Sequence, residues 1–309
     1  MKIPMKHPMK IPMKNPMKIP VKEDDYMKKA DTLTSAALVP EQRIAGTAPK
    51  KRRKRIQPEK MITVGTVATI LVLWYVVTAL GMVNPILLPS PLAVWTAFLD
   101  ILLNGYKGFS LMQHIGTSLW RLLSAFGLAV VVAIPLGLLS GFNSKIKAAL
   151  DPIINFYRPL PPLAYYTLLV MALGIADASK VALLFLAAFA PIYVSCVSAV
   201  AKVNKDFINS AKTVGANKRQ VFFHVILPSC LPDILTSLRT ALSVAYTTLV
   251  SAEMVAAMTG IGWLVLDASN YMRSDIVFVG IIIMGITGIL LDRIIVIIQN
   301  KFVPWAGKY

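Results

Sequence analysis

The sequence NSAKTVGANKRQVFFHVILP occupies residues 209–228, between two apolar runs that are each long enough to cross a membrane. Within this polar and basic stretch, four apolar residues recur at helical spacing, and Gly215 separates them from an earlier helical turn. The four are Val221, Phe222, Val225 and Ile226. The pattern predicts two short helices with a sharp bend, which project from the membrane and offer this apolar face to a soluble partner.

The composition excludes an ordinary soluble domain. The chain has 309 residues, of which 56% are hydrophobic and only 15% are charged, and its mean hydropathy is +0.64. Six runs approach the roughly 20 apolar residues that cross a bilayer core, and prolines interrupt one of them, 148–174. The other runs lie near residues 61–82, 122–141, 180–201, 238–258 and 275–298. We therefore predict an all-α membrane domain over residues 61–309, with six transmembrane helices.

The net charge of +17 is unevenly placed along the chain, which argues against a nucleic-acid partner. Residues 1–60 alone carry 16 Lys/Arg and six Asp/Glu. In the remainder, the excess of Lys and Arg falls in alternate connections between the apolar runs. By the positive-inside rule, both termini and the stretch 209–228 are cytoplasmic. Asp292 and Arg293 lie near the cytoplasmic end of the last run and are expected to pair locally.

The first 60 residues are predicted to form a disordered, basic, cytoplasmic tail. Residues 1–20 are five copies of Met-Lys-x-Pro, and proline at every fourth position excludes a regular helix. The six consecutive Lys/Arg at 50–55 resemble a nuclear import signal. Because they stand just before the first apolar run, we interpret them as an anchor against anionic lipid headgroups. We assign the repeats no chemistry.

The interrupted run is a candidate for the lining of a transport pathway. Its centre reads Tyr157-Arg158-Pro159-Leu160-Pro161-Pro162, and such breaks are tolerated in a membrane where protein or a watery cavity satisfies the freed backbone groups. A simple kink in the bundle core also accounts for the prolines, but it accounts less well for the arginine. We predict that Tyr157, Arg158 and Pro161 line the pathway.

A second set of polar residues lies in the fifth run. Glu253 is an ionisable group inside an apolar helix, where a carboxylate faces a cavity or a partner. It is predicted either to line the pathway with Thr247 and Ser251, or to form an ion pair with Arg121 or Arg158. The sequence does not decide between these two roles.

The stretch 209–228 resembles the cytoplasmic coupling loop of ABC importer permeases, which is written EAA, three residues, G, nine residues, I, x, L, P. The matching residues are Ser210, Ala211, Gly215, Val225, Leu227 and Pro228. Asn209 replaces the usual glutamate of the loop. The resemblance implies contact with an ATPase through Asn209, Ser210, Ala211, Lys212, Gly215, Arg219, Leu227 and Pro228.

Further stretches resemble the permease subgroup that serves taurine, alkanesulfonates, nitrate, bicarbonate and cyanate. Residues 150–154, 157–164 and 304–308 most resemble the taurine and sulfonate branch. Tyr165, Thr167 and Ala172 depart from that branch. The resemblance implies the type I ABC importer permease fold and import of a small sulfonate, with taurine first and nitrate, bicarbonate or another aliphatic sulfonate as alternatives.

The resemblance also implies an assembly in a bacterial inner membrane. Its parts are two copies of this chain, two ATPase subunits and an extracytoplasmic substrate-binding protein. The sequence contains no G-x-x-x-x-G-K-[ST] phosphate loop, so ATP and Mg²⁺ are expected on the ATPase subunits. No catalytic, cofactor or metal site is expected in this chain.

Two other classes of membrane protein fit less well. A gradient-driven secondary transporter or channel predicts several intramembrane carboxylates or an inverted repeat, whereas Glu253 is nearly alone. A membrane enzyme requires a cluster of catalytic groups or metal ligands. The three histidines, His7, His114 and His224, are dispersed along the chain.

Overall fold

The computed structural model describes residues 58–304, and these residues form helices and connecting turns without a β-strand. The predicted tail, including its repeats and the basic cluster at 50–55, lies outside the described residues, except that the first helix already begins at Pro58. The helices are α2 (Pro58–Ala79), α3 (Pro91–Asn104), α4 (Leu111–Phe142), α5 (Ser144–Tyr157), α6 (Pro162–Leu173), α7 (Asp177–Lys202), α8 (Lys205–Thr213), α9 (Lys218–Val221), the π-helical turn η1 (Phe222–Ile226), α10 (Leu227–Ala256), α11 (Ile261–Asn270) and α12 (Ser274–Phe302). The all-α prediction is confirmed.

Five helices in the described part of the chain are long and apolar enough to cross a membrane. They are α2, α4, α7, α12 and the continuous helical stretch Lys218–Ala256 that contains α10. The predicted sixth span, 148–174, is folded as two shorter helices, α5 with 14 residues and α6 with 12. Pro159, Pro161 and Pro162 explain the break, because each removes a backbone donor and disfavours helix in the residue before it.

The central bundle consists of α4, α7 and α10, and its main core is built on small residues of α4. Ala125, Ala129, Ala133, Gly137 and Gly141 recur every fourth residue and form one ridge of that helix. The three alanines are completely buried. A Cβ atom on Gly137 would come within 2.9 Å of a backbone carbonyl of α7, and one on Gly141 would meet a side chain of α7. The absence of larger side chains therefore allows α4 and α7 to approach closely, as small residues do between membrane helices.

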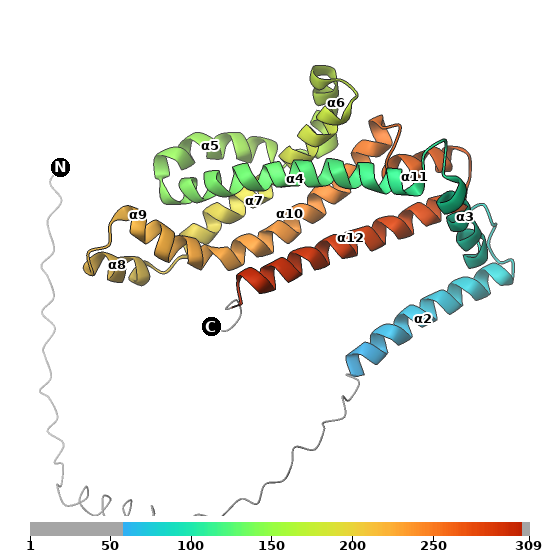
Figure 1. Ribbon diagram of the computed structural model, residues 1–309, viewed down its shortest axis with the longest axis horizontal. Helices are drawn as coiled ribbons and strands as arrows, with labels where there is room; N and C mark the ends of the chain where they lie inside the picture. The colour runs from blue at the N-terminus through green and yellow to red at the C-terminus, as the bar shows by residue number, and fades with distance from the viewer. Residues whose placement is uncertain (1–57, 305–309) are drawn as a thin grey trace, which may run out of the picture. The chain divides into compact units, whose positions relative to one another are not determined.

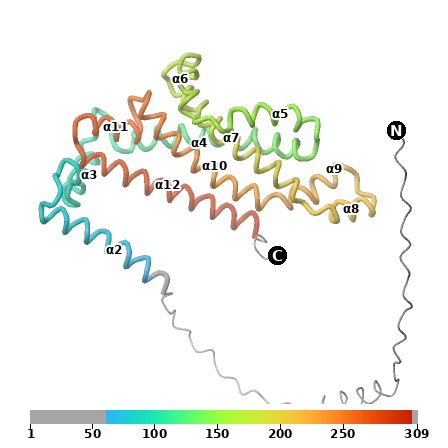
Figure 2. Tube along the Cα trace, turned by 180° about the vertical axis from the view of Figure 1, so that it is seen from behind, coloured from blue at the N-terminus to red at the C-terminus, as the bar shows by residue number. Residues whose placement is uncertain are grey.

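The short helices in the connections between the long helices lie at the two opposite ends of the bundle. Figures 1 and 2 both show α8 and α9 at one end, near the end of α12, and α3 and α11 at the other. Helix α3 begins with a Ser90 cap followed by Pro91. Positive-inside reasoning predicts that the α8 end is cytoplasmic.

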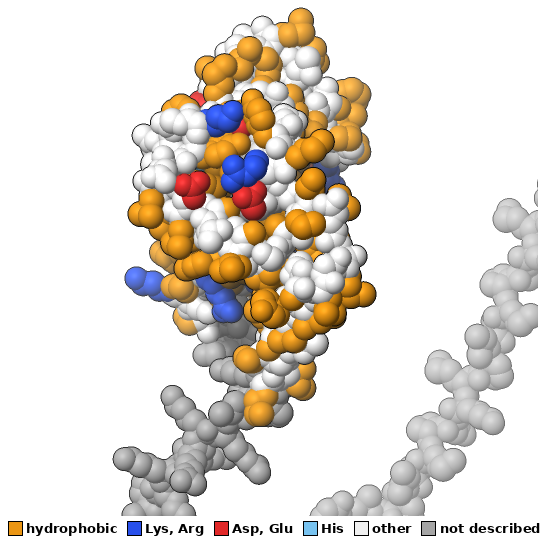
Figure 3. All heavy atoms as spheres, turned by 90° about the vertical axis from the view of Figure 1, so that its right-hand side faces the viewer, with side chains coloured by type: hydrophobic (Ala, Val, Ile, Leu, Met, Phe, Trp, Pro, Cys, Tyr) orange, Lys and Arg blue, Asp and Glu red, His pale blue; other side chains and the backbone are white. Residues whose placement is uncertain are grey.

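Polar contacts tie together the end that carries α3 and α11. Tyr106 donates a hydrogen bond to Asp267 at 2.7 Å, and Lys107 lies 3.7 Å from the same carboxylate. Burial and this hydrogen bond raise the pKa of Tyr106 well above its usual range. Figure 3 faces this end and shows Lys or Arg side chains next to Asp or Glu side chains, with hydrophobic side chains around them.

The local pairing predicted for Asp292 and Arg293 is wrong. Asp292 of α12 instead accepts two hydrogen bonds from Arg239 of α10, at 2.8 and 2.9 Å. Neighbouring residues on a helix point about 100° apart, so they do not face each other, whereas residues on adjacent helices do.

Candidate functional site

Helix α8 is the exposed half of the loop between α7 and α10, and none of its side chains is buried. At its C-terminus the backbone of Gly215 takes φ +88°, a left-handed conformation that costs glycine least. The amides of Gly215 and Ala216 donate to the carbonyls of Lys212 and Ala211 at 2.9 and 3.0 Å, which is the Schellman arrangement. The bend predicted at Gly215 is confirmed, and it is a defined helix cap.

Helix α9 and η1 form the anchored half of the loop. Asn217 and Gln220 cap α9 reciprocally, because each side chain accepts a hydrogen bond from the other residue's amide, at 2.9 and 2.8 Å. The helix then continues through η1 into α10, so the loop has one free helix and one helix that is an extension of the bundle. The two predicted short helices are present.

The prediction that Val221, Phe222, Val225 and Ile226 present an apolar face to a soluble partner is wrong. Val221 and Ile226 are buried in the chain's own core, and Phe222 and Val225 are half-buried. Because α9 and η1 continue into α10, their apolar stripe packs on the bundle like that of any amphipathic helix. The large apolar side chains that are exposed on this loop are Phe207, Val214 and Phe223, and Val214 is 89% exposed.

The eight residues predicted to contact an ATPase divide into two sets. Five are exposed, namely Asn209, Ser210, Lys212, Gly215 and Arg219. Three are half-buried, namely Ala211, Leu227 and Pro228. Ala211 packs against the core, and Leu227 and Pro228 begin α10, so these three position the loop from within the bundle. The contact with a partner stays a prediction.

Glu253 lies at the centre of a buried polar network near the opposite end of α10. Its side chain is completely buried, and its Oε1 lies 2.9 Å from Nη1 of Arg121 on α4. The hydroxyl of Ser118 lies 2.8 and 2.9 Å from the two carboxylate oxygens. The amide of Gly262, at the start of α11, donates to Oε2 at 2.9 Å. Of the two ion-pair partners predicted for Glu253, Arg121 is the one the structure provides.

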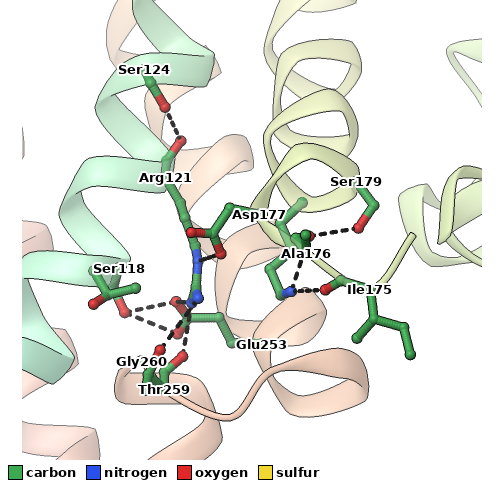
Figure 4. A network of polar contacts seen from close by, with 12 residues as sticks. Ser118, Arg121, Ser124, Ile175, Ala176, Asp177, Ser179, Glu253, Thr259 and Gly260 are labelled. Atoms are coloured by element: carbon green, nitrogen blue, oxygen red, sulfur yellow. Dashed lines mark hydrogen bonds and ion pairs between the residues drawn. The ribbon is translucent and has the colours of Figure 1, made fainter. Parts of the chain in front are cut away.

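Arg121 joins this network to two further elements, as Figure 4 shows. Its Nε lies 2.7 Å from Asp177, the first residue of α7, and its Nη1 donates to the carbonyl of Thr259 at 2.8 Å. The network therefore links α4, α7, α10 and the turn before α11. A Cβ atom on Gly260 would collide with the Glu253 carboxylate, and one on Gly262 would collide with the backbone carbonyl of Val250, so both glycines are required for this turn to close over the carboxylate.

We expect Ser118→Ala to lower the free energy of unfolding by about 1–3 kcal/mol, because it removes a hydrogen-bond donor from a buried carboxylate. The Ser118 hydroxyl also accepts from the amide of Ile261 at 2.9 Å, which would lose its partner. Thermal unfolding of the purified chain in detergent measures the change. Thr117→Ala is the control, since that exposed hydroxyl bonds only within α4 and its loss is expected to cost less than about 0.5 kcal/mol. Equal effects of the two changes would contradict the prediction.

The six predicted pathway residues fall in three places. Tyr157, Arg158 and Pro161 lie at the junction of α5 and α6, where Arg158 and Pro161 are exposed. Thr247 is exposed and Ser251 half-exposed on one face of α10. Glu253 is instead buried in the network. That these residues line a route stays a prediction.

Sequence reasoning missed Ser118, Asp177 and Thr259 as partners in the network. Ser118 is 135 residues from Glu253 along the chain, and such a contact leaves no local pattern. The sequence signal that points to such a network is charge balance. A lone arginine and a lone glutamate in two apolar helices each require a partner in a membrane.

A bundle of membrane-length helices with a capped, exposed helical loop is the architecture of an integral membrane protein. The family described as binding-protein-dependent transport system inner membrane component matches residues 133–304. The chain belongs to this family of ABC importer permeases.

Three curated relatives place the chain within the subgroup of taurine, alkanesulfonate and nitrate permeases. The taurine transport system permease protein of Escherichia coli (strain K12) is 39% identical, covering 84% of this chain and 94% of the relative. A putative aliphatic sulfonates transport permease protein of Bacillus subtilis (strain 168) is 31% identical, covering 78% and 86%. A nitrate import permease protein of Synechocystis is 31% identical, covering 85% and 98%.

Proposed function

We propose that this chain is the membrane-spanning subunit of an ATP-driven importer of a small sulfonate, with taurine as the first candidate. The observation that carries the proposal is the 39% identity to the taurine transport system permease over 84% of the chain. The exposed α8 helix, held by the Gly215 cap, supports an energy supply from a separate ATPase.

Two copies of the chain would form the translocation route, with two ATPases docked at the α8 end. An extracytoplasmic binding protein would deliver the substrate at the other end. When ATP closes the two ATPases, each would move one α8 helix. Because α9 and η1 are continuous with α10, that motion would pass directly into a membrane-spanning helix and favour one of two orientations of the route. Both termini would be cytoplasmic, as positive-inside reasoning predicts.

Co-purification and ATP hydrolysis test this proposal. The full chain is purified with its ATPase, reconstituted in vesicles, and assayed with candidate binding proteins and their ligands. We expect taurine-loaded binding protein to stimulate ATP hydrolysis severalfold over binding protein without ligand. If no ATPase co-purifies, the proposal fails as a whole. If a nitrate-loaded protein alone stimulates hydrolysis, the choice of a sulfonate is wrong.

Import of nitrate or of another aliphatic sulfonate is the second candidate function. The relatives with those names are each 31% identical and cover most of this chain, so the same architecture fits these anions. The same assay distinguishes them, since each ligand is presented separately.

A further inference from the structure

One face of α10 carries hydroxyl side chains over most of its length. They lie at intervals of three or four residues, which places them on one side of the helix over about 22 Å. These residues are Thr236, Thr240, Ser243, Thr247 and Ser251. The first four are exposed and Ser251 is half-exposed. Sequence reasoning selected only Thr247 and Ser251 from this face.

Two ion pairs flank the hydroxyl face, one on each side. Toward α12, Arg239 holds Asp292 through two hydrogen bonds of 2.8 and 2.9 Å. Toward α7, Lys202 lies 3.3 Å from Asp233, and their side chains are 72% and 47% exposed. Exposed charges within a membrane domain face a water-filled space or another protein chain, because contact with lipid is costly. The part of the hydroxyl face beside these pairs therefore borders a polar space.

Next to the Lys202–Asp233 pair, α7 and α10 enclose a groove of about 320 Å³. Hydroxyl groups from both helices line it, together with the ion pair itself. The hydroxyl groups placed to bind a ligand belong to Ser195, Ser198 and Thr240. The Thr236 hydroxyl already donates to the carbonyl of Pro232 and accepts from the side-chain amide of Gln299. Lys202 is the last residue of α7 and Asp233 is in the second turn of α10, so the groove lies toward the α8 end. The site thus offers a cation, an anion and several hydroxyl groups within one groove.

We propose that this groove is a release-side binding site for a zwitterionic aminosulfonate, whose sulfonate binds Lys202 and the hydroxyl groups while its ammonium binds Asp233. The proposal rests on the proposed function and specifies the chemistry of its substrate. A single long contact between exposed side chains contributes little, so the pair opens readily. A bound zwitterion replaces the Lys202–Asp233 ion pair by two ion pairs, one with each side chain. A plain anion would pair with Lys202 alone and leave Asp233 without a cation. The doubly bonded Arg239–Asp292 pair resists such opening.

Protection of an introduced thiol tests the site without any partner protein. Ser198→Cys in the full chain, in lipid nanodiscs, is labelled with a positively charged, membrane-impermeant methanethiosulfonate. The two native cysteines are buried, so the unsubstituted chain provides the background. Taurine at twice its dissociation constant is expected to slow labelling about threefold, by occupying two thirds of the sites. Ethanesulfonate, which lacks the amino group, is expected to bind about tenfold more weakly.

Charge substitutions in the Ser198→Cys background separate the two contacts. Asp233→Asn is expected to remove the preference for taurine over ethanesulfonate, and Asp233→Glu to restore it. Lys202→Gln is expected to weaken protection by both compounds. Asp292→Asn is the matched control, a carboxylate from the other ion pair, and should leave the preference unchanged. A thiol introduced by Ile297→Cys on an exposed apolar face of α12 should not be labelled, whether or not taurine is present.

Several results would overturn the site. An unreactive thiol at position 198 would mean that the groove is closed to water or covered by a second copy. Equal protection by taurine and ethanesulfonate, or the same loss from Asp292→Asn as from Asp233→Asn, would refute the assignment to Asp233. These outcomes leave the proposed function intact, since that function fails only if the reconstituted complex does not respond to any sulfonate.

Discussion

Arg121→Met is expected to lower the free energy of unfolding by about 3–5 kcal/mol, since it leaves the completely buried carboxylate of Glu253 without its cation. Arg121 also bonds Asp177 and the carbonyl of Thr259, so the substitution removes links from α4 to two other elements. For a domain of this size, such a loss lowers the unfolding midpoint by about 10 °C. Thermal unfolding of the full chain in detergent measures the shift.

The matched control is Arg273→Met, which breaks an ion pair of similar length with Asp275 at a partly exposed site, where the two side chains are 50% and 24% exposed. Its expected cost is below about 1 kcal/mol, because water solvates the carboxylate that remains. In the double variant Arg121→Met with Glu253→Gln, part of the lost stability should return, since no buried charge is left unpaired. If Arg121→Met and Arg273→Met shift the midpoint equally, the network does not stabilise the bundle as argued.

Gly215→Pro is expected to leave the chain folded but to abolish stimulation of ATP hydrolysis in the reconstituted complex. Proline fixes φ near −65°, whereas this residue has φ +88°. The substitution also removes the amide that donates to Lys212, so the Schellman cap cannot form. The residue is exposed, and a Cβ atom there would contact nothing within 4 Å, so the damage stays local to the loop.

Gly108→Pro is the matched control for this prediction. Gly108 also has a positive φ, of +85°, and no neighbour that a Cβ atom would meet, but it lies in the loop before α4 at the opposite end of the bundle. The Gly108→Pro substitution should disturb its own turn to a similar degree and leave the stimulation of ATP hydrolysis intact. Gly215→Ala, which keeps the amide, should give an intermediate loss. Unimpaired stimulation in Gly215→Pro would refute the role of the α8 cap in coupling.

Much of the fold follows from patterns that are local in the chain. Apolar runs of membrane length predict five long helices that the structure contains. The Gly215 bend follows from a single residue type with a distinct backbone preference. The interrupted run between α4 and α7 is ambiguous from sequence, because prolines are compatible with either a kinked span or two separate helices. The structure separates α5 from α6.

The candidate sites depend more strongly on which faces meet in three dimensions. Helical spacing identified Val221 and Ile226 as one apolar face, yet spacing cannot say whether that face meets a partner or the chain's own core. The structure buries both. It leaves Phe207 and Val214 exposed, and these residues carry no periodic signal of their own.

The sequence by itself determined that this protein is an all-α membrane protein with a bent loop at Gly215, because span length and backbone preference act over short distances. The motif within residues 209–228 added the resemblance to ABC importer permeases. Only the tertiary structure decided that Glu253 pairs with Arg121, that Asp292 pairs with Arg239, and that Lys202 meets Asp233. A buried or membrane-embedded charge requires a partner, but the helix that supplies it is chosen by packing. In this bundle, the small residues of α4 bring α7 close and so fix which side chains can meet.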